Sequence, residues 1–168
     1  MLCWQQVGNK LGPIVSIDGS VTGDVYTSLL RDNLLPYLDV LASDGITGIT
    51  LQQDNARPHT CKKAKAFFDI AMAEHKFSVM DNWPPYSPDM NLIENLWAHL
   101  KLELHRRYPD TATLSGSPQH IRQCITKRVH EVWWSIGEDV LDRLIDSMPH
   151  CVHALIKAHG WYTKYSIL

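Results

Sequence analysis

The sequence predicts a mixed α/β fold, and three observations carry this prediction. Two strand-like segments, at about 2–8 and 11–17, flank Gly8-Asn9-Lys10, where Gly and Asn tolerate the positive φ of a hairpin turn. Segments with helical spacing of apolar residues then alternate with short strand-like segments. Hydrophobic residues make up 45% of the 168 positions, enough for a substantial core. This alternation predicts helices on both faces of a small mixed sheet.

The first predicted helix covers about 24–42, because its apolar residues recur at helical spacing. These residues are Val25, Leu29, Leu30, Leu34, Tyr37, Leu38 and Leu41. Thr22 is suited to cap this helix at its N-terminus. Pro36 lies inside the pattern and has no backbone N–H. It therefore predicts a kink, or a join between two shorter helices.

A strand over about 47–53 is predicted to end at Asp54, and a loop follows as far as Pro58. Thr60 is the expected N-cap of a second helix, which runs to about Glu74. The buried stripe of this helix is predicted to consist of Ala64, Phe67, Phe68 and Ala71.

The later part of the chain is predicted to be mainly helical. Its expected elements are a short strand at 77–80, a rigid proline loop at 83–89, and helices at about 91–107, 118–135 and 137–158. The segment 109–118 is rich in Pro, Gly, Ser and Thr and predicts a linker. We therefore expect a core over 1–108 and packed C-terminal helices with a tail over 119–168.

Composition narrows the function classes. The formal charge of −2 is unusual for a free-standing DNA-binding domain. Any DNA binding must therefore rest on a local basic surface or on other segments. Four scattered cysteines predict reduced thiols in an intracellular, non-secreted protein. Cys151-Val152-His153 has half the ligands of a zinc site, but no second half follows. No apolar stretch approaches the ~20 residues that span a membrane, and no signal peptide is apparent.

Two carboxylates stand out. Asp54 follows a predicted strand, and ligand sites in α/β sheets usually lie beyond the carboxyl ends of the strands. Glu94 lies near the start of the predicted helix at 91–107. Mg²⁺ and Mn²⁺ prefer oxygen ligands, and a cation pair about 3.5–4 Å apart can hold the attacking and leaving oxygens of a phosphodiester. The pair therefore suits the binding of such cations.

Two segments carry a resemblance to a known family. QQDNARPHT at 52–60 and WPPYSPDMNLIENLW at 83–97 resemble the signature blocks of Tc1/mariner DDE transposases, and 12–19 and 147–165 extend the match. The resemblance implies an RNase H-like core that cuts and joins transposon-end DNA in the nucleus with Mg²⁺ or Mn²⁺, and it leaves open a homo-oligomer. It aligns Asp54 with the second catalytic Asp and Glu94 with the third acidic residue, as catalytic and metal-binding groups.

Two departures from the family pattern affect this expectation. The spacing between Asp54 and Glu94 is longer than is usual in the Tc1 group. The family's first catalytic Asp lies on a strand before the segment that Cys3-Trp4-Gln5 resembles, and this chain starts at that segment. We therefore expect an N-terminally truncated core with two of three acids and little or no cleavage activity by itself. A missing strand should also expose backbone hydrogen-bonding groups on its neighbour.

The resemblance also suggests supporting roles. Asn55 and His59 are expected to orient Asp54 or a substrate phosphate. Nucleic-acid contacts are expected from Lys62, Lys63, Trp83, Tyr86, Lys101, Arg106 and Arg107.

Each of these residues has a structural alternative. Asp54, Asn55 and His59 are also suited to stabilising a turn and loop, and Glu94 suits the positive end of a helix. The lysines suit a solvated face, the arginines suit a helix C-terminus, and the aromatic residues belong to a rigid proline loop.

Three functions follow from these alternatives. The leading hypothesis is a fragment of a DDE transposase catalytic domain. A domesticated interaction protein that keeps the fold without the chemistry would be indifferent to Asp54→Ala. An RNase H-like nuclease that recruits another acid would hydrolyse nucleic acid without joining strands.

Overall fold

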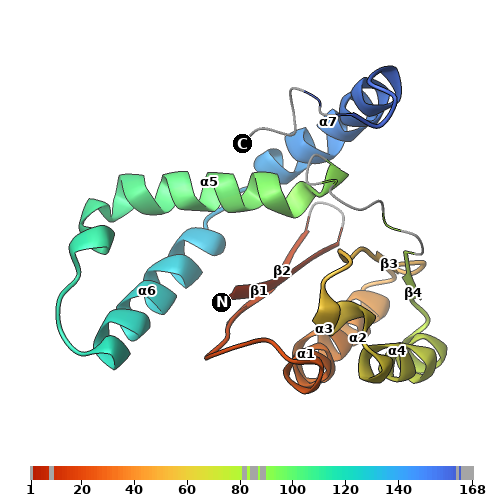
Figure 1. Cartoon of the computed structure of the whole chain (residues 1–168), viewed down its shortest axis with the longest axis horizontal. Coiled ribbons are helices and arrows are strands. Elements are labelled where there is room, and N and C mark those ends of the chain that lie inside the picture. The colour runs from red at the N-terminus through yellow and green to blue at the C-terminus, as the bar shows by residue number, and fades with distance from the viewer. Residues whose placement is uncertain are drawn as a thin grey trace. The chain divides into compact units, whose positions relative to one another are not determined.

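The computed structural model describes residues 2–7, 10–80, 83, 87, 90–161 and 163, and of residues 2–7 only the backbone. The chain divides into two compact units, with the main boundary between Pro85 and Tyr86. The elements of the first unit, in chain order, are β1 (Leu2–Val7), β2 (Lys10–Ser16), α1 (Gly23–Leu29), η1 (Leu30–Leu34), α2 (Leu35–Ser43), β3 (Thr50–Leu51), α3 (Arg57–Thr60), α4 (Lys62–His75) and β4 (Ser78–Val79). They are drawn from red to yellow-green in Figure 1.

The described strands pair as two two-stranded sheets. β1 and β2 are neighbours in one of them, and Lys10 belongs to β2. The predicted turn at Gly8-Asn9 lies outside the described residues. β3 and β4 pair in parallel in the other sheet, with Thr50 opposite Ser78.

The predicted strand at 47–53 is too long. Gly48 has a φ of +70°, which an extended strand cannot adopt, so β3 begins only after it. The ladder ends where the N–H of Met80 donates to the carbonyl of Leu51 at 2.8 Å. Asp54 therefore lies in the loop beyond β3 and not directly at a strand end.

The predicted join at Pro36 is confirmed. η1 is a π-helical turn, in which the N–H of Leu35 donates to the carbonyl of Leu30, five residues earlier. Pro36 follows at the start of α2, where its missing N–H is tolerated. The side chain of Asn33 donates to the carbonyl of Leu29 at 3.0 Å. A widened turn thus lets α1 and α2 follow one another around the proline.

The core of the first unit lies between α1–α2 and α4, which Figure 1 shows side by side. Its buried members are Tyr26, Leu30, Leu34, Leu38, Ala64, Phe68, Ala71 and Phe77. The ring of Phe68 meets those of Tyr26 and Phe77 edge to face, at centroid distances of 6.5 and 6.4 Å. These contacts confirm most of the predicted stripe, with Phe67 only partly buried.

The predicted cap of α4 is wrong by one residue. Thr60 is the last residue of α3, and its hydroxyl donates to the carbonyl of Ala56 at 3.3 Å. Cys61 has the extended backbone of an N-cap, and its sulfur accepts the N–H of Ala64 at 3.4 Å. The short helix α3 had no apolar period of its own, so the sequence pattern did not reveal it.

Apart from Lys10 and Leu11 of β2, the second unit has no strand in the part that the structure describes. Its elements are α5 (Leu92–Arg107), η3 (Pro109–Thr113), α6 (Pro118–Trp133) and α7 (Glu138–Lys157). These bounds agree closely with the predicted helices. Fully buried side chains include Leu96, Val132, Trp133 and Leu141, and the ring of Trp97 lies 6.2 Å from that of Trp133. α5 therefore packs against both α6 and α7.

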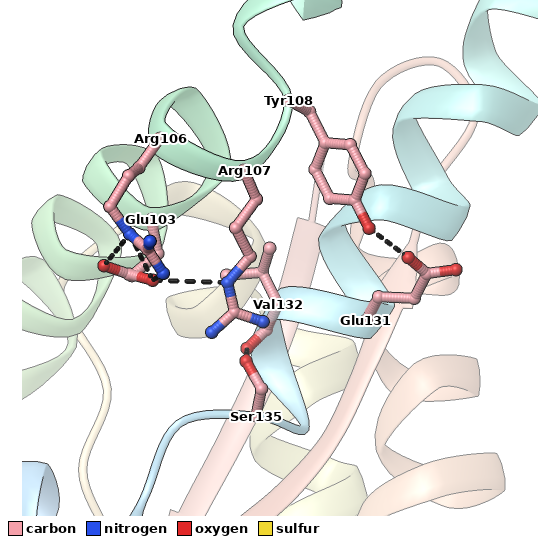
Figure 2. A network of polar contacts seen from close by, with 7 residues as sticks. All are labelled: Glu103, Arg106, Arg107, Tyr108, Glu131, Val132 and Ser135. Atoms are coloured by element: carbon pink, nitrogen blue, oxygen red, sulfur yellow. Dashed lines mark hydrogen bonds and ion pairs between the residues drawn. The ribbon is translucent and has the colours of Figure 1, made fainter.

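Figure 2 shows the polar network at the end of α5. The carboxylate of Glu103 accepts hydrogen bonds from Arg106, at 2.9–3.2 Å, and from Arg107, at 3.2 Å. The hydroxyl of Tyr108 donates to Glu131 on α6. The contact of Tyr108 with Glu131 links the end of α5 to α6, whereas the Glu103 contacts lie within α5.

The segment predicted as a linker begins with η3, which is fastened to α6. Arg128 on α6 donates to Asp110 at 2.7 Å and to Thr111 at 2.8 Å. Its guanidinium also lies 4.9 Å from the ring centroid of Tyr108. The division into a core over 1–108, a linker and C-terminal helices over 119–168 stays a prediction.

Candidate metal-binding residues

The loop after β3 holds the carboxylate of Asp54 in a defined orientation. Its Oδ1 accepts the N–H of Ala56 at 3.0 Å, as in an Asx turn. Nδ1 of His59 lies 2.7 Å from the same oxygen and donates to it in the Nδ1–H tautomer. No hydrogen bond from the described residues reaches Oδ2, and the side chain is 57% exposed. One oxygen is thus fixed while the other stays open to a ligand.

His59 is in turn held by the core. Its ring packs on that of Tyr26, with centroids 4.4 Å apart. Tyr26 is only 6% exposed, and its hydroxyl donates to Oε1 of Gln53 at 2.6 Å. Gln53, His59 and Asp54 are therefore all tied to one buried ring.

Sequence reasoning did not select Tyr26 or Gln53. The only local signal was the spacing of Tyr26, four residues before Leu30, which marks a core position on α1. The contact with His59 joins residues far apart in the chain.

Asn55 has a structural role in this loop. Its side-chain amide donates to the backbone carbonyl of Trp83 at 2.9 Å. This bond ties the loop after β3 to the start of the proline segment. Trp83 itself is partly buried, and Tyr86 lies outside the described residues.

Glu94 lies in the first turn of α5 in the second unit, whereas Asp54 belongs to the first. Its side chain is exposed, although its apolar neighbours Ile93 and Leu96 suggested the border of the buried face. Its carboxylate accepts no hydrogen bond from the described residues. It is thus a free oxygen donor at the positive end of a helix.

The basic residues of α4 differ in their contacts. Lys63 forms an ion pair with Asp24 on α1, whereas Lys62 is exposed. Both side chains of the ion pair are more than half exposed, so its contribution to stability is small.

The basic residues of α5 also differ. Arg106 and Arg107 share Glu103, whose hydrogen bond from Arg106 is the main cause of its lowered pKa. The same bond raises the pKa of Arg106. Lys101 is exposed. The two arginines are therefore partly neutralised where they were expected to meet phosphate.

Within the described ranges, no group of three or more His, Cys, Asp or Glu side chains is arranged to hold a metal ion. In the same ranges, no helix has both the length and the apolar character to cross a membrane. What the described residues do provide are single carboxylates, one of them firmly oriented.

Comparison with solved structures defines the class of fold. The chain matches the catalytic domain of Mos1 transposase solved with raltegravir and Mg, with a TM-score of 0.78 and 15% identity over 97% of this chain and 76% of that one. The same domain solved with raltegravir and Mn matches with a TM-score of 0.72 and 16% identity, over 97% and 76%. The fold is that of an RNase H-like transposase catalytic domain, as the resemblance implied.

Sequence relatives and a family model then give the family. The Tcb2 transposase of Caenorhabditis briggsae is 30% identical over 158 residues, 94% of this chain and 51% of the relative. The Tc1 transposase of Caenorhabditis elegans is 30% identical over 156 residues, 93% and 50%. The chain spans about half the length of the curated relatives it matches. The model for DDE superfamily endonucleases matches residues 6–115, and the chain belongs to that family.

Proposed function

We propose that this chain is part of a Tc1/mariner-like transposase catalytic domain in which Asp54 and Glu94 hold divalent cations for cutting and joining DNA. The observation that carries the proposal is the loop 53–59. There a carboxylate from the family-like block is oriented by Ala56 and His59 while its second oxygen stays open. An Asx turn needs only the hydrogen bond from Ala56, so the additional hydrogen bond from His59 indicates a further role for the carboxylate.

The chemistry of the donors fits Mg²⁺ or Mn²⁺. Both carboxylates are exposed oxygen ligands, and hard cations take oxygen ligands. A bound pair of such ions supplies activation of a water or 3′-hydroxyl and stabilisation of the leaving oxygen. The chain's own part is to hold Oδ1 of Asp54 through Ala56 and His59, so that the carboxylate does not have to reorganise on binding.

DNA is the proposed partner. Lys62, Lys63, Lys101, Arg106 and Arg107 are the candidates for phosphate contacts. The ion pair of Lys63 with Asp24 is exposed enough for phosphate to compete. Trp83 and Tyr86 are the candidates for base contacts. Binding that rests on a few phosphates should weaken steeply with salt.

Three further points rest on the same family likeness. We propose a nuclear location and a homo-oligomeric state. We also propose that the 168 residues alone cleave DNA little or not at all, because two carboxylates hold a cation pair less firmly than three.

The test measures the affinity of the 168-residue chain for Mn²⁺ by calorimetry. Asp54→Asn and Glu94→Gln should each lower the affinity at least tenfold, since each removes a charged oxygen ligand. Asp69→Asn and Glu74→Gln on α4 are matched controls, because both side chains are exposed and outside the proposed site. Unchanged affinity in both test variants would overturn the proposal and favour an interaction protein that has kept only the fold.

A further inference from the structure

We propose that His120 and Cys124 on α6 form a separate binding site for a borderline or soft divalent cation such as Zn²⁺. The two side chains lie one turn apart on the same helix, four residues from each other. Sγ of Cys124 and Nε2 of His120 are 3.6 Å apart. Thiolate and imidazole are the donor types that zinc prefers.

The separation of the two atoms fits one shared ion. Zinc binds thiolate sulfur at about 2.3 Å and imidazole nitrogen at about 2.0–2.1 Å. With these bond lengths, a gap of 3.6 Å corresponds to a sulfur–zinc–nitrogen angle of about 110°, which is close to tetrahedral. The separation of the two donors therefore matches that of two ligands on one tetrahedral ion.

The start of α6 helps to hold the imidazole in place. A Cβ at Gly116 would lie 3.2 Å from Cδ2 of His120, so the ring packs closely over the glycine backbone. Gly116 has a φ of +125°, which other residues rarely adopt. Ser117 caps the helix by accepting the N–H of His120 at 3.2 Å. A donor held in this way loses less freedom when it binds a metal.

Exposure also favours the site. His120 is exposed and Cys124 is partly exposed, so an ion can reach both. Two protein donors leave the other positions of a tetrahedral ion to water.

The donor set separates this site from the proposed carboxylate chemistry. Sulfur and nitrogen ligands select zinc-like ions, whereas Mg²⁺ requires oxygen. Binding at His120 and Cys124 should therefore persist in excess Mg²⁺ and should not depend on Asp54.

Cys151 and His153 on α7 provide a natural comparison. They have the same donor types but lie only two residues apart, about 200° around the helix axis. Cys151 is 4% exposed while His153 is exposed. Their side chains do not converge, so this pair should not bind an ion together.

The experiment is a Co²⁺ titration of the full 168-residue chain under reducing conditions in excess Mg²⁺. The thiolate-to-cobalt charge-transfer absorption measures binding. We expect a band that saturates at one ion per chain and is displaced by Zn²⁺. Cys124→Ser should abolish the band, and His120→Gln should weaken Co²⁺ binding at least tenfold. Cys151→Ser, His153→Ala and Asp54→Asn should leave both unchanged. Circular dichroism establishes that each variant remains folded.

Three results would overturn the proposal. The first is a charge-transfer band that survives Cys124→Ser, since another thiol would then be the ligand. The second is a band lost in folded Cys151→Ser. The third is an unchanged affinity in folded His120→Gln, which would leave the sulfur as a single, non-chelating ligand.

Discussion

Asp54 and Glu94 are positioned by different means, although we propose the same task for both. The carboxylate of Asp54 is oriented by side chains, through His59 and the buried ring of Tyr26. The carboxylate of Glu94 accepts no hydrogen bond within the described residues. Its position depends on the α5 backbone, which is fixed by the burial of residues such as Leu96. One acid therefore depends on a polar network and the other on helix packing.

The largest expected effect concerns the packing of α5, which positions Glu94. Leu96→Ala should lower the free energy of unfolding by about 2–5 kcal/mol, because a side chain with 0% exposure leaves a cavity. Urea denaturation measures the change. Leu102→Ala on the same helix is the control, since Leu102 is 66% exposed and its loss should cost less than about 0.5 kcal/mol. Equal effects of the two variants would contradict the role of α5 burial.

The next effect concerns the network that orients Asp54. His59→Ala should lower Mn²⁺ affinity by about 10–100-fold, as is typical when a group that orients a metal ligand is removed. Calorimetry measures the affinity, and the unfolding midpoint shows whether the fold is kept. His75→Ala is a matched control, because His75 makes a similar 2.8 Å contact with Asp39 away from the site. A similar loss of affinity in the two variants would show that His59 acts only through stability.

A smaller effect is expected one step further from the carboxylate. Tyr26→Phe keeps the ring under His59 but removes the hydrogen bond to Gln53. We expect a loss of about 0.5–1.5 kcal/mol in unfolding free energy, and a loss of Mn²⁺ affinity smaller than that of His59→Ala. A larger loss of Mn²⁺ affinity in Tyr26→Phe than in His59→Ala would contradict the proposal that Tyr26 acts on Asp54 through His59.

The smallest effect is a pH dependence in the second unit. The hydrogen bond from Arg128 is the main cause of the lowered pKa of Asp110. A lowered folded pKa contributes stability above the ordinary pKa, and this contribution disappears as pH falls through the folded value. Asp110→Asn should therefore be slightly less stable than the parent at neutral pH. The difference should shrink below about pH 4, and a difference that grows in acid would contradict the sign.

The sequence predicted those elements whose signals are local. The end of the segment 109–118, rich in Pro, Gly, Ser and Thr, placed the start of α6, and Pro36 placed the join between α1 and α2. The same kind of signal placed the start of α5 and hence Glu94 in its first turn.

The errors and omissions have a different origin. β3 is shorter than predicted because Gly48 and the short β4 limit pairing, which depends on a partner strand far along the chain. Tyr26 was not selected because its contact with His59 crosses from α1 to α3. The sequence motif was thus enough to select Asp54 as a candidate ligand. The contacts that orient its carboxylate could not be predicted from the local sequence.

The most direct test asks whether the same bound cations lie close to both Asp54 and Glu94. Mn²⁺ broadens the NMR signals of nuclei close to it, so the backbone amides around Asp54 and Glu94 can be followed during a titration of the 168-residue chain. The account predicts that both groups of signals broaden together at the same low Mn²⁺ concentration, and that Asp54→Asn abolishes the effect at both. Broadening near only one of them, or none at either before non-specific binding sets in, would contradict a shared metal site.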